Sequence, residues 1–362
     1  MRTLTRAVLC SAGILPAFAY FLASPGPGGA GRAEARPYNF AAQAPTIRET
    51  ELLATARVFP EAGAGVRALR RDAAGRYYVL FLRSVWVFGS EGKKLAELPA
   101  SSAASPNAKH DPAQLVFADG FDVGPDGRLY IADRAADAVK IFRASGELER
   151  TFSVAQPTAV VALPDDEVAV SSASLVPTRD RPVRLIAVYD ARGRVIREFG
   201  DLTTLAERFE LNRYLHFGHL AADAAHNLYY AFSYFPEPTV RKYDRFGYAA
   251  MELELTSLDV QPAAQAARRE IAKQERGGTP MMKPVVNAFG VDADGDTVWL
   301  ALGNRLMLFD KDGFRRGLYR TYTPEGARLE PGAILVEADR LLLATDALGI
   351  FEFPRPDKAK PQ

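Results

Sequence analysis

The chain has 362 residues, of which 48% are hydrophobic and 25% are charged. A chain of this length and composition can bury a large core, which excludes an intrinsically disordered protein and a small fold that depends on disulfides. Lysine and arginine number 45 against 44 aspartate and glutamate residues. This balance gives no overall field that would attract nucleic acid, so we expect no nucleic-acid partner.

The N-terminal segment has the pattern of a secretory signal. Arg2 and Arg6 precede an apolar stretch over 7–23, and a run rich in proline and glycine then breaks any helix. A charged start, an apolar middle and small residues before the cleavage point are the parts of such a signal. We therefore predict a signal peptide over 1–35, a flexible tail over 36–50, and a secreted or periplasmic mature chain.

The rival interpretation is an anchor that stays uncleaved. The apolar stretch has about 17 residues, close to the minimum for a bilayer core of roughly 30 Å, and Pro16 interrupts it. Uncleaved, this segment would be the membrane contact of the protein, and we predict no other. Cys10, the only cysteine, lies inside the same stretch, so a cleaved chain would have no disulfide and would be stabilised by packing.

A repeated pattern then runs along the chain. Five times an aromatic residue that ends a short apolar run is followed four positions later by glycine: Phe88 and Gly92, Phe142 and Gly146, Tyr189 and Gly193, Tyr243 and Gly247, Phe309 and Gly313. A sixth such run ends at Phe351. Intervals of about 50 residues leave room for four strands per copy. The pattern predicts an all-β, six-bladed β-propeller over residues 51–356.

The second copy, residues 120–152, divides into four strands separated by tight turns. Aligning the other copies on it places the innermost strand of each blade near Ala68, Gly120, Thr158, His219, Ala288 and Gly332. We expect these strands to be buried on both faces between neighbouring blades, which agrees with continuous apolar runs such as 159–163.

The two ends of the chain predict how the ring closes. The sixth copy has no sequence for a fourth strand, because Pro354 and a charged tail over 357–362 follow its third. Upstream of the first copy, residues 52–59 form a strand-like run with no blade of its own. We predict that this run is the outer strand of the last blade, so that the chain ends meet.

The longest insert between strands contains a predicted helix over about 259–277. Asp259 is placed to cap it, Pro262 suits its first turn, and Gly277 is placed to end it. One interpretation is a surface helix that fills a gap between blades, and the other is a lid or a partner-binding helix.

A known family resembles the second copy. Residues 120–133 read Gly-Phe-Asp-Val-Gly-Pro-Asp-Gly-Arg-Leu-Tyr-Ile-Ala-Asp, followed by Val-Lys-Ile-Phe at 139–142 and by Gly146. This pattern resembles the NHL-type repeat of six-bladed β-propellers; residues 284–322 match it less fully, and the other four copies weakly. The resemblance implies the fold. It selects no activity, since such propellers include protein-binding modules, RNA binders, a peptide-amidating lyase and relatives of calcium-dependent lactonases and strictosidine synthase.

Insert lengths distinguish the two faces of the predicted ring. Turns between the first and second strands, and between the third and fourth, are short and lie on one face. The long inserts lie on the opposite face, at 99–117, 173–182, 203–217, 233–238 and 255–286. Long loops on one rim of a rigid scaffold are where binding residues are usually carried, so this long-loop face is the predicted site.

Histidines on that face are candidates for ligand binding. The segment containing Tyr214, His216 and His219 leads into the fourth inner strand, so two imidazoles could approach the channel mouth, where a zinc enzyme needs ligands. His226 lies about 20 Å further along that strand, and His110 would join only if its loop folds inward. The alternative is a structural, hydrogen-bonding role for the pair.

Oxygen ligands are the other candidates. Asp119 and Asn287 precede the second and fifth inner strands, the position at which lactonase-like propellers hold calcium. The equivalent positions in the other blades are Arg67, Pro157, Gly218 and Pro331, which supply no side-chain oxygen. Two ligands are too few for calcium. The sequence therefore requires no cofactor, while calcium and zinc stay open alternatives.

Two functions from different classes follow. The first is a secreted or periplasmic binding or scaffold module that presents the long-loop face to a protein, peptide or glycan. The second is an extracytoplasmic metal-dependent hydrolase or lyase with its site at the channel mouth. The ligand-binding candidates for either are Asp119, Tyr214, His216, His219 and Asn287, and no nucleophile elbow or phosphate-binding loop is present.

Export can be tested on the native protein. We expect cleavage near Ala33 or Ala35, because small residues occur there after the apolar stretch. N-terminal sequencing of the protein from fractionated cells measures this. Intact Met1 in the cytoplasmic fraction would contradict the prediction, and intact Met1 in membranes would instead support the anchor.

Overall fold

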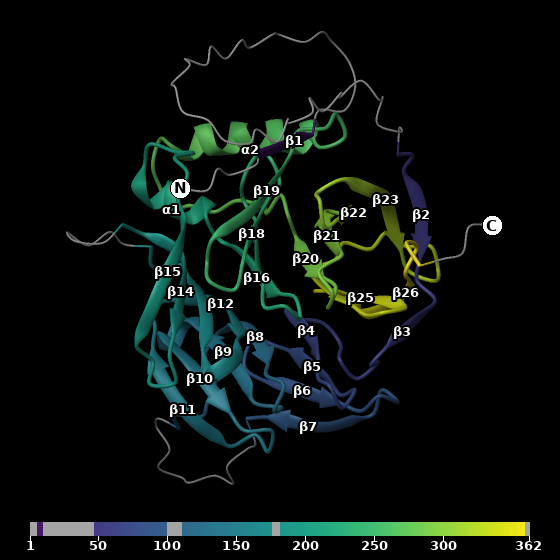
Figure 1. The fold of residues 1–362 in the computed structure, drawn as a ribbon. Coiled ribbons are helices and arrows are strands. Elements are labelled where there is room, and N and C mark those ends of the chain that lie inside the picture. Colours follow the sequence, from purple (N-terminus) through teal and green to yellow (C-terminus); the bar gives the residue numbers. More distant parts are fainter. Residues whose placement is uncertain (1–5, 10–46, 100–110, 176–181, 359–362) are drawn as a thin grey trace, which may run out of the picture.

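Six sheets surround a central axis as the blades of a β-propeller (Figure 1). The computed structural model describes residues 6–9, 47–99, 111–175 and 182–358. The predicted six-bladed, all-β architecture is confirmed, and the six inner strands begin within two residues of the predicted positions. Most of the predicted signal peptide lies outside the described residues.

Each blade has its strands in chain order, from the axis outward. Blades one to three are β4 Ala68–Arg71, β5 Tyr77–Leu80, β6 Val85–Phe88 and β7 Lys94–Leu98; β8 Ala118–Val123, β9 Leu129–Asp133, β10 Ala138–Phe142 and β11 Leu148–Ser153; and β12 Pro157–Ala162, β13 Val168–Ser172, β14 Arg184–Tyr189 and β15 Val195–Asp201.

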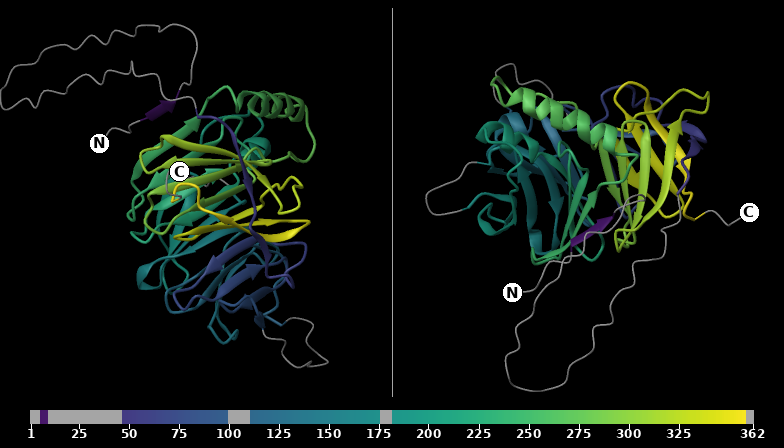
Figure 2. Two further views of the ribbon diagram at one scale, coloured as in Figure 1. Left: turned by 90° about the vertical axis from the view of Figure 1, so that its right-hand side faces the viewer. Right: turned by 90° about the horizontal axis from the view of Figure 1, so that it is seen from above.

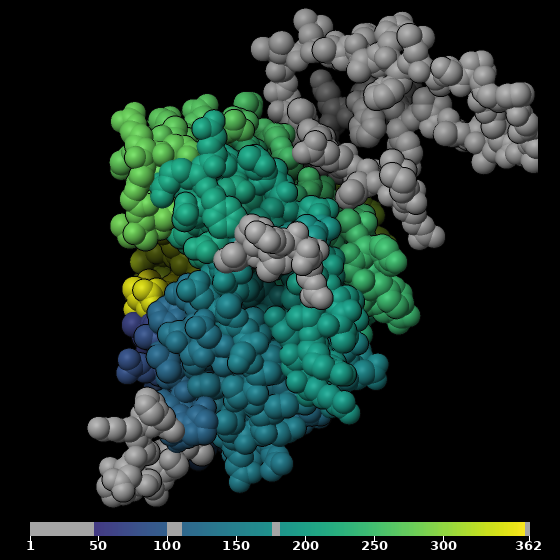
Figure 3. Space-filling model, turned by 90° about the vertical axis from the view of Figure 1, so that its left-hand side faces the viewer, coloured from purple at the N-terminus to yellow at the C-terminus, as the bar shows by residue number. Residues whose placement is uncertain are grey.

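Blades four to six follow the same order. They are β16 Gly218–Ala222, β17 Leu228–Phe232, β18 Thr239–Tyr243 and β19 Ala249–Leu255; β20 Ala288–Val291, β21 Thr297–Leu302, β22 Arg305–Asp310 and β23 Arg315–Tyr322; and β24 Ala333–Val336, β25 Arg340–Thr345 and β26 Gly349–Pro354. Figure 3 shows the side of the ring where blades two, three and four pack against one another.

The repeated aromatic and glycine residues have a local structural cause. The pairing of the third and fourth strands shifts register at each of these aromatic residues, Phe88, Phe142, Tyr189, Tyr243 and Phe309. Each following glycine has a positive φ, for example 84° at Gly92 and 92° at Gly247, a conformation that costs glycine little. The repeat is therefore a β-bulge followed by a turn with a left-handed glycine.

The N-terminal run closes the ring, as predicted, but with fewer residues. β3, Ala56–Val58, pairs antiparallel with β26 as the outer strand of blade six. The prediction that 52–59 is one strand is wrong, because β2, Thr50–Leu53, pairs parallel with β23 of blade five. The backbone N–H of Ala54 donates a hydrogen bond to blade five, and that of Thr55 donates one to blade six. The segment therefore joins the outer edges of these two blades. A further short strand, β1, Arg6–Leu9, pairs parallel with β19.

Two helices lie on one face of the ring beside blade four (Figure 2). The predicted helix is α2, Gln261–Gln274, with Pro262 in its first turn. Asp259 does not cap it; the N-cap is Val260 and the Asp259 carboxylate pairs with Arg315 at 2.6 Å. A second helix, α1, Phe209–Leu215, was not predicted.

The two helices stabilise each other. They share a small core in which Leu211 and Leu215 of α1 pack with Ala267 and Ile271 of α2. The Glu275 carboxylate accepts hydrogen bonds from the backbone N–H groups of Glu207 and Arg208 at the start of α1, at 2.7 and 3.2 Å. The contacts favour the interpretation of α2 as a docked surface helix. Within the described ranges, no helix is both long and apolar enough to cross a membrane.

The closing segment predicts a stability difference between two phenylalanines. Phe59 is 4% exposed and its ring lies 5.0 Å from Tyr77 and 4.9 Å from Phe88, between blades six and one. We expect Phe59→Ala to lower the free energy of unfolding by about 3 kcal/mol through the lost packing. The matched control is Phe314→Ala on an outer turn, 49% exposed, which should change it by less than about 0.5 kcal/mol. Equal denaturant midpoints for the two variants would contradict the closure.

Candidate functional site

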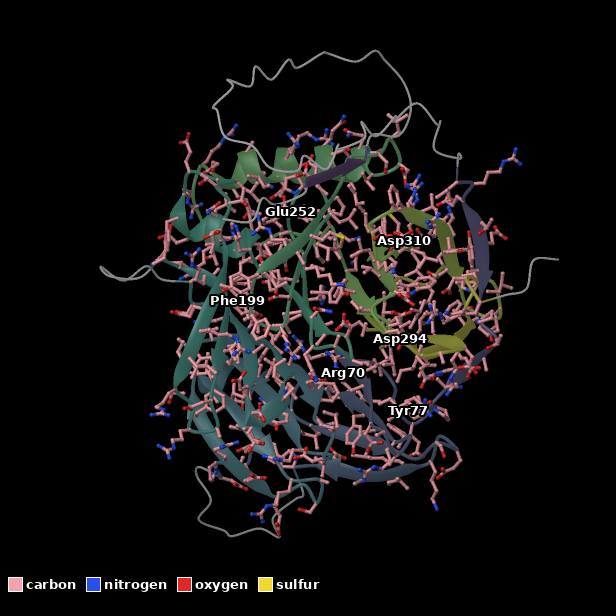
Figure 4. All side chains as sticks on the ribbon, in the orientation of Figure 1. Arg70, Tyr77, Phe199, Glu252, Asp294 and Asp310 are labelled. Carbon is pink, nitrogen blue, oxygen red and sulfur yellow. The ribbon has the colours of Figure 1, made fainter. Side chains whose placement is uncertain are left out.

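The inner strands enclose a central channel with a cavity of about 1000 Å³, to which all six blades contribute. Every inner strand begins at the long-loop face, so residues just before it lie at that end, here called the long-loop mouth. Residues that follow the inner strands lie at the opposite end, the short-turn mouth. Arg70 of β4 and Asp294, after β20, both line this cavity and are labelled in Figure 4.

A cluster of two arginines and one aspartate lies at the long-loop mouth. Arg67 precedes β4, Asp119 is in β8, and Arg134 follows β9. One carboxylate oxygen of Asp119 pairs with the Arg67 guanidinium, and the other lies 3.1 Å from Arg134 Nη1. Burial raises the pKa of Asp119 above its ordinary value, although Arg134 and Arg67 act in the opposite direction. We refer to these three residues as the Arg–Asp–Arg cluster.

Phe117 orders both arginines. The guanidinium carbons of Arg67 and Arg134 lie 4.8 and 4.5 Å from the centre of its ring, which is cation–π distance. The backbone N–H of Phe117 in turn donates to the buried carboxylate of Asp133 at 2.8 Å, and Asp133 forms an ion pair of 2.9 Å with buried Lys140. Hydrogen bonds and an ion pair within blade two thus hold the Phe117 ring against which both arginines pack.

Aromatic side chains line the same mouth on the side of blade four. Tyr234 and Phe217 line the cavity. The ring of Tyr214, in α1, lies 4.5 Å from Tyr234 and 5.2 Å from Phe217, so the three rings form one group. Burial, the hydrogen bond with Tyr214 and the charge of Asp119 all raise the pKa of Tyr234. The mouth therefore combines charged and apolar walls.

His216 is held by the backbone on both sides of its ring. The Nδ1 atom lies 2.7 Å from the carbonyl oxygen of Asn212, and Nε2 accepts from the N–H of Thr203 at 3.0 Å. Its ring stacks edge-on against Phe232 and Phe235. Burial lowers the pKa of His216 to about 4. These contacts favour the structural alternative for this residue.

The other predicted residues are divided between the cavity and its surroundings. Asp119 and His219 both line the cavity, and burial lowers the pKa of His219 to about 4. The ring of Tyr214 packs against the ring of Tyr234. The side chain of Asn287 accepts a hydrogen bond of 2.7 Å from the N–H of Gly303. Their predicted roles in binding are left as predictions, and His110 lies outside the described residues.

The short-turn mouth has a different electrostatic organisation. Arg71 pairs with Glu337 at 2.9 Å, and Arg355 lies 3.3 Å from Asp292 and also pairs with Asp357. Each arginine here is matched by carboxylates. In the part of the chain that the structure describes, no group of three His, Cys, Asp or Glu side chains is placed to hold a metal ion.

Sequence reasoning missed four residues of the mouth: Arg67, Phe117, Arg134 and Tyr234. Arg67 occupies the position equivalent to Asp119 in its blade and was considered only as a residue without a ligand oxygen. Arg134 directly follows Asp133, the last residue of the clearest repeat. The sequence signal that could have found this cluster is the opposite charge of Arg67 and Asp119, which occupy equivalent positions in neighbouring blades.

Comparison with known proteins gives the fold alone. No protein-family model matches the sequence, and no curated protein is significantly similar to it. The structure is similar to a putative exported protein from Bacteroides fragilis, with 11% identity, 85% of this chain and 94% of that chain covered, and a TM-score of 0.55. It is also similar to hydrazine synthase from Kuenenia stuttgartiensis, with 11% identity, 81% and 96% covered, and a TM-score of 0.49. Virginiamycin B lyase from Staphylococcus aureus matches at 13% identity, 84% and 88% covered, with a TM-score of 0.45.

The surroundings of His216 predict a loss of stability on its replacement. His216→Ala leaves the Thr203 N–H and the Asn212 carbonyl without this partner, and we expect a loss of about 3 kcal/mol in the free energy of unfolding. His219→Ala, at the cavity wall, should cost less. Urea denaturation of both variants measures the difference, and a larger loss for His219→Ala would contradict the structural role.

The same effect should depend on pH. The folded state keeps His216 neutral down to about pH 4, whereas the unfolded chain protonates its histidines near the ordinary pKa of 6.5. Protons therefore bind preferentially to the unfolded chain between these values, and the wild type loses stability as the pH falls. His216→Ala lacks this term, so its deficit should shrink from neutral pH toward pH 4. A constant deficit would contradict a neutral His216.

Proposed function

We propose that this protein is a secreted or periplasmic binding module, an NHL-like propeller that receives a protein, peptide or glycan ligand at its long-loop mouth. The observation that carries the proposal is that two walls of one cavity differ in chemistry: one wall is charged and the other is aromatic. The Arg–Asp–Arg cluster lies on the side of blades one and two, and Tyr214, Phe217 and Tyr234 lie on the side of blade four.

This arrangement suits recognition. Half-buried tyrosine and arginine side chains in a concave site are the residues that contribute most to binding energy at interfaces. The propeller supplies rigidity, because the walls are attached to inner strands packed between blades, and a rigid site loses little entropy when it binds. The N-terminal signal pattern supports the extracytoplasmic location.

The other predicted function, a metal-dependent hydrolase or lyase, had His216 among its candidate residues, together with His219, Asp119 and Asn287. Both ring nitrogens of His216 face backbone groups at hydrogen-bond distance. The geometry around this residue therefore gives the binding module the stronger support, and chemical conversion of the ligand becomes an outcome of the test.

The test begins with capture of ligands from the native compartment on the immobilised mature protein, followed by titration of the recovered ligand. We expect Tyr234→Leu to weaken binding at least about tenfold, equivalent to 1.4 kcal/mol, because it removes the stacking surface of the mouth. Phe314→Ala, on the opposite rim, is the control and should bind like wild type.

Two results would contradict the proposal. Wild-type affinity in Tyr234→Leu with loss in Phe314→Ala would move the site to the other rim. Conversion of the recovered ligand into a product by the wild type would favour the hydrolase or lyase instead.

A further inference from the structure

We propose that Arg67 and Arg134 bind an anionic group of the ligand, a carboxylate or a phosphate ester attached to an apolar body, and that Asp119 is an internal counter-ion which this group displaces. The inference rests on the proposed function, since it concerns the ligand of the same mouth. It names the chemistry that the mouth recognises.

The cluster carries more positive than negative charge. Two guanidinium groups face one carboxylate in the Arg–Asp–Arg cluster, which leaves one positive charge in excess. His219, which begins an inner strand at this end, is neutral because burial lowers its pKa to about 4. Asp346 also lines the cavity at this mouth, but it is exposed, and within the described residues it forms no ion pair with either arginine. Within the cluster, one positive charge is therefore left without a paired carboxylate.

The two arginines have hydrogen-bonding capacity that the cluster does not use. A guanidinium carries five N–H donors. The Asp119 carboxylate engages one nitrogen of Arg67 and one of Arg134, and the Nε of Arg67 is buried without a hydrogen-bond partner among the described residues. Buried donors without partners are costly, and a planar anion can satisfy two donors of an arginine at once.

The two arginines are preorganised for binding. Stacking on Phe117 holds both guanidinium groups in place before a ligand arrives, and the Asp133 carboxylate fixes the backbone of Phe117. The two arginine side chains stay about one-third exposed, at 33% and 34%, whereas Asp119 is 13% exposed. The arginines are thus ordered and accessible together, which reduces the entropy lost on binding.

The opposite wall indicates what is attached to the anion. Tyr234 lies close enough to the cluster for the charge of Asp119 to affect its pKa, and its ring belongs to the group formed with Tyr214 and Phe217. An apolar or aromatic body joined to the anion by a short linker would therefore contact Tyr234 while the anion meets the arginines. At the short-turn mouth, Arg71 and Arg355 are each paired with carboxylates, so the inference concerns one mouth only.

The experiment uses small probes on the full mature protein. 3-Phenylpropionate and 3-phenylpropionamide have the same body and differ in charge, and phenyl phosphate supplies the other anion. Ligand-observed NMR titration at low salt measures their affinities. We expect the acid to bind at least about tenfold more tightly than the amide, and added salt to weaken the acid alone, because exposed charges are screened. If 3-phenylpropionate binds more tightly than phenyl phosphate, the anionic group of the ligand is a carboxylate; if phenyl phosphate binds more tightly, it is a phosphate ester.

Variants separate an anion site from a structural cluster. Arg67→Met and Arg134→Met should each weaken the acid at least about tenfold, and Arg67→Lys should fall between, since it keeps the charge but loses the planar fork. Asp119→Asn should strengthen binding severalfold, because it removes the competing carboxylate. Arg71→Met, at the other mouth, is the matched control and should have no effect. Thermal unfolding of each variant checks that it is folded.

Several results would overturn the inference. They are equal affinity for acid and amide, binding of neither anion at millimolar concentration, weaker binding in Asp119→Asn, or equal losses in Arg71→Met and Arg67→Met. If these occur while Tyr234→Leu still weakens the captured ligand, the proposed function stands and the anionic ligand is wrong. If Tyr234→Leu also leaves the captured ligand unaffected, both fail.

Discussion

The structure depends on one constraint: each inner strand must be covered by a blade on either side, and the ring must therefore close. Closure is made by the short β3 strand on β26, with Phe59 packed against Tyr77 and Phe88 of blade one. Once the ring is closed, the six inner strands are held in fixed positions around the axis. The residues just before them then form a rigid rim, and a binding site on that rim needs no folding of its own.

The sequence was sufficient for features that depend on local chemistry. An aromatic residue followed four positions later by glycine predicts a bulge and a turn, because a left-handed conformation favours glycine. Closure of the ring was predicted because the sixth blade has no sequence for a fourth strand. Features set by distant contacts were missed or wrong: β2 bends away to blade five, Glu275 from another insert binds the backbone just before α1, and Asp259 pairs with Arg315 instead of capping α2.

The same limit explains what was predicted of the site. Strand register placed Asp119 and His219 on the cavity, because inner-strand positions can be counted. His216 was expected as a metal ligand or a hydrogen-bonding residue, and its partners are backbone groups of its own loop. Arg67, Arg134 and Phe117 come from two blades and meet only in the folded ring. In the sequence, only the opposite charges of Arg67 and Asp119, at equivalent positions of neighbouring blades, indicate that such a cluster forms.

The central claim is that the long-loop mouth binds an anion on two arginines. A crystal structure of the mature protein grown with 3-phenylpropionate tests it most directly. The account predicts the carboxylate against the guanidinium groups of Arg67 and Arg134, Asp119 displaced from at least one of them, and the phenyl ring on Tyr234. A probe bound at the short-turn mouth, or a cavity without the probe and an unchanged cluster, would contradict it.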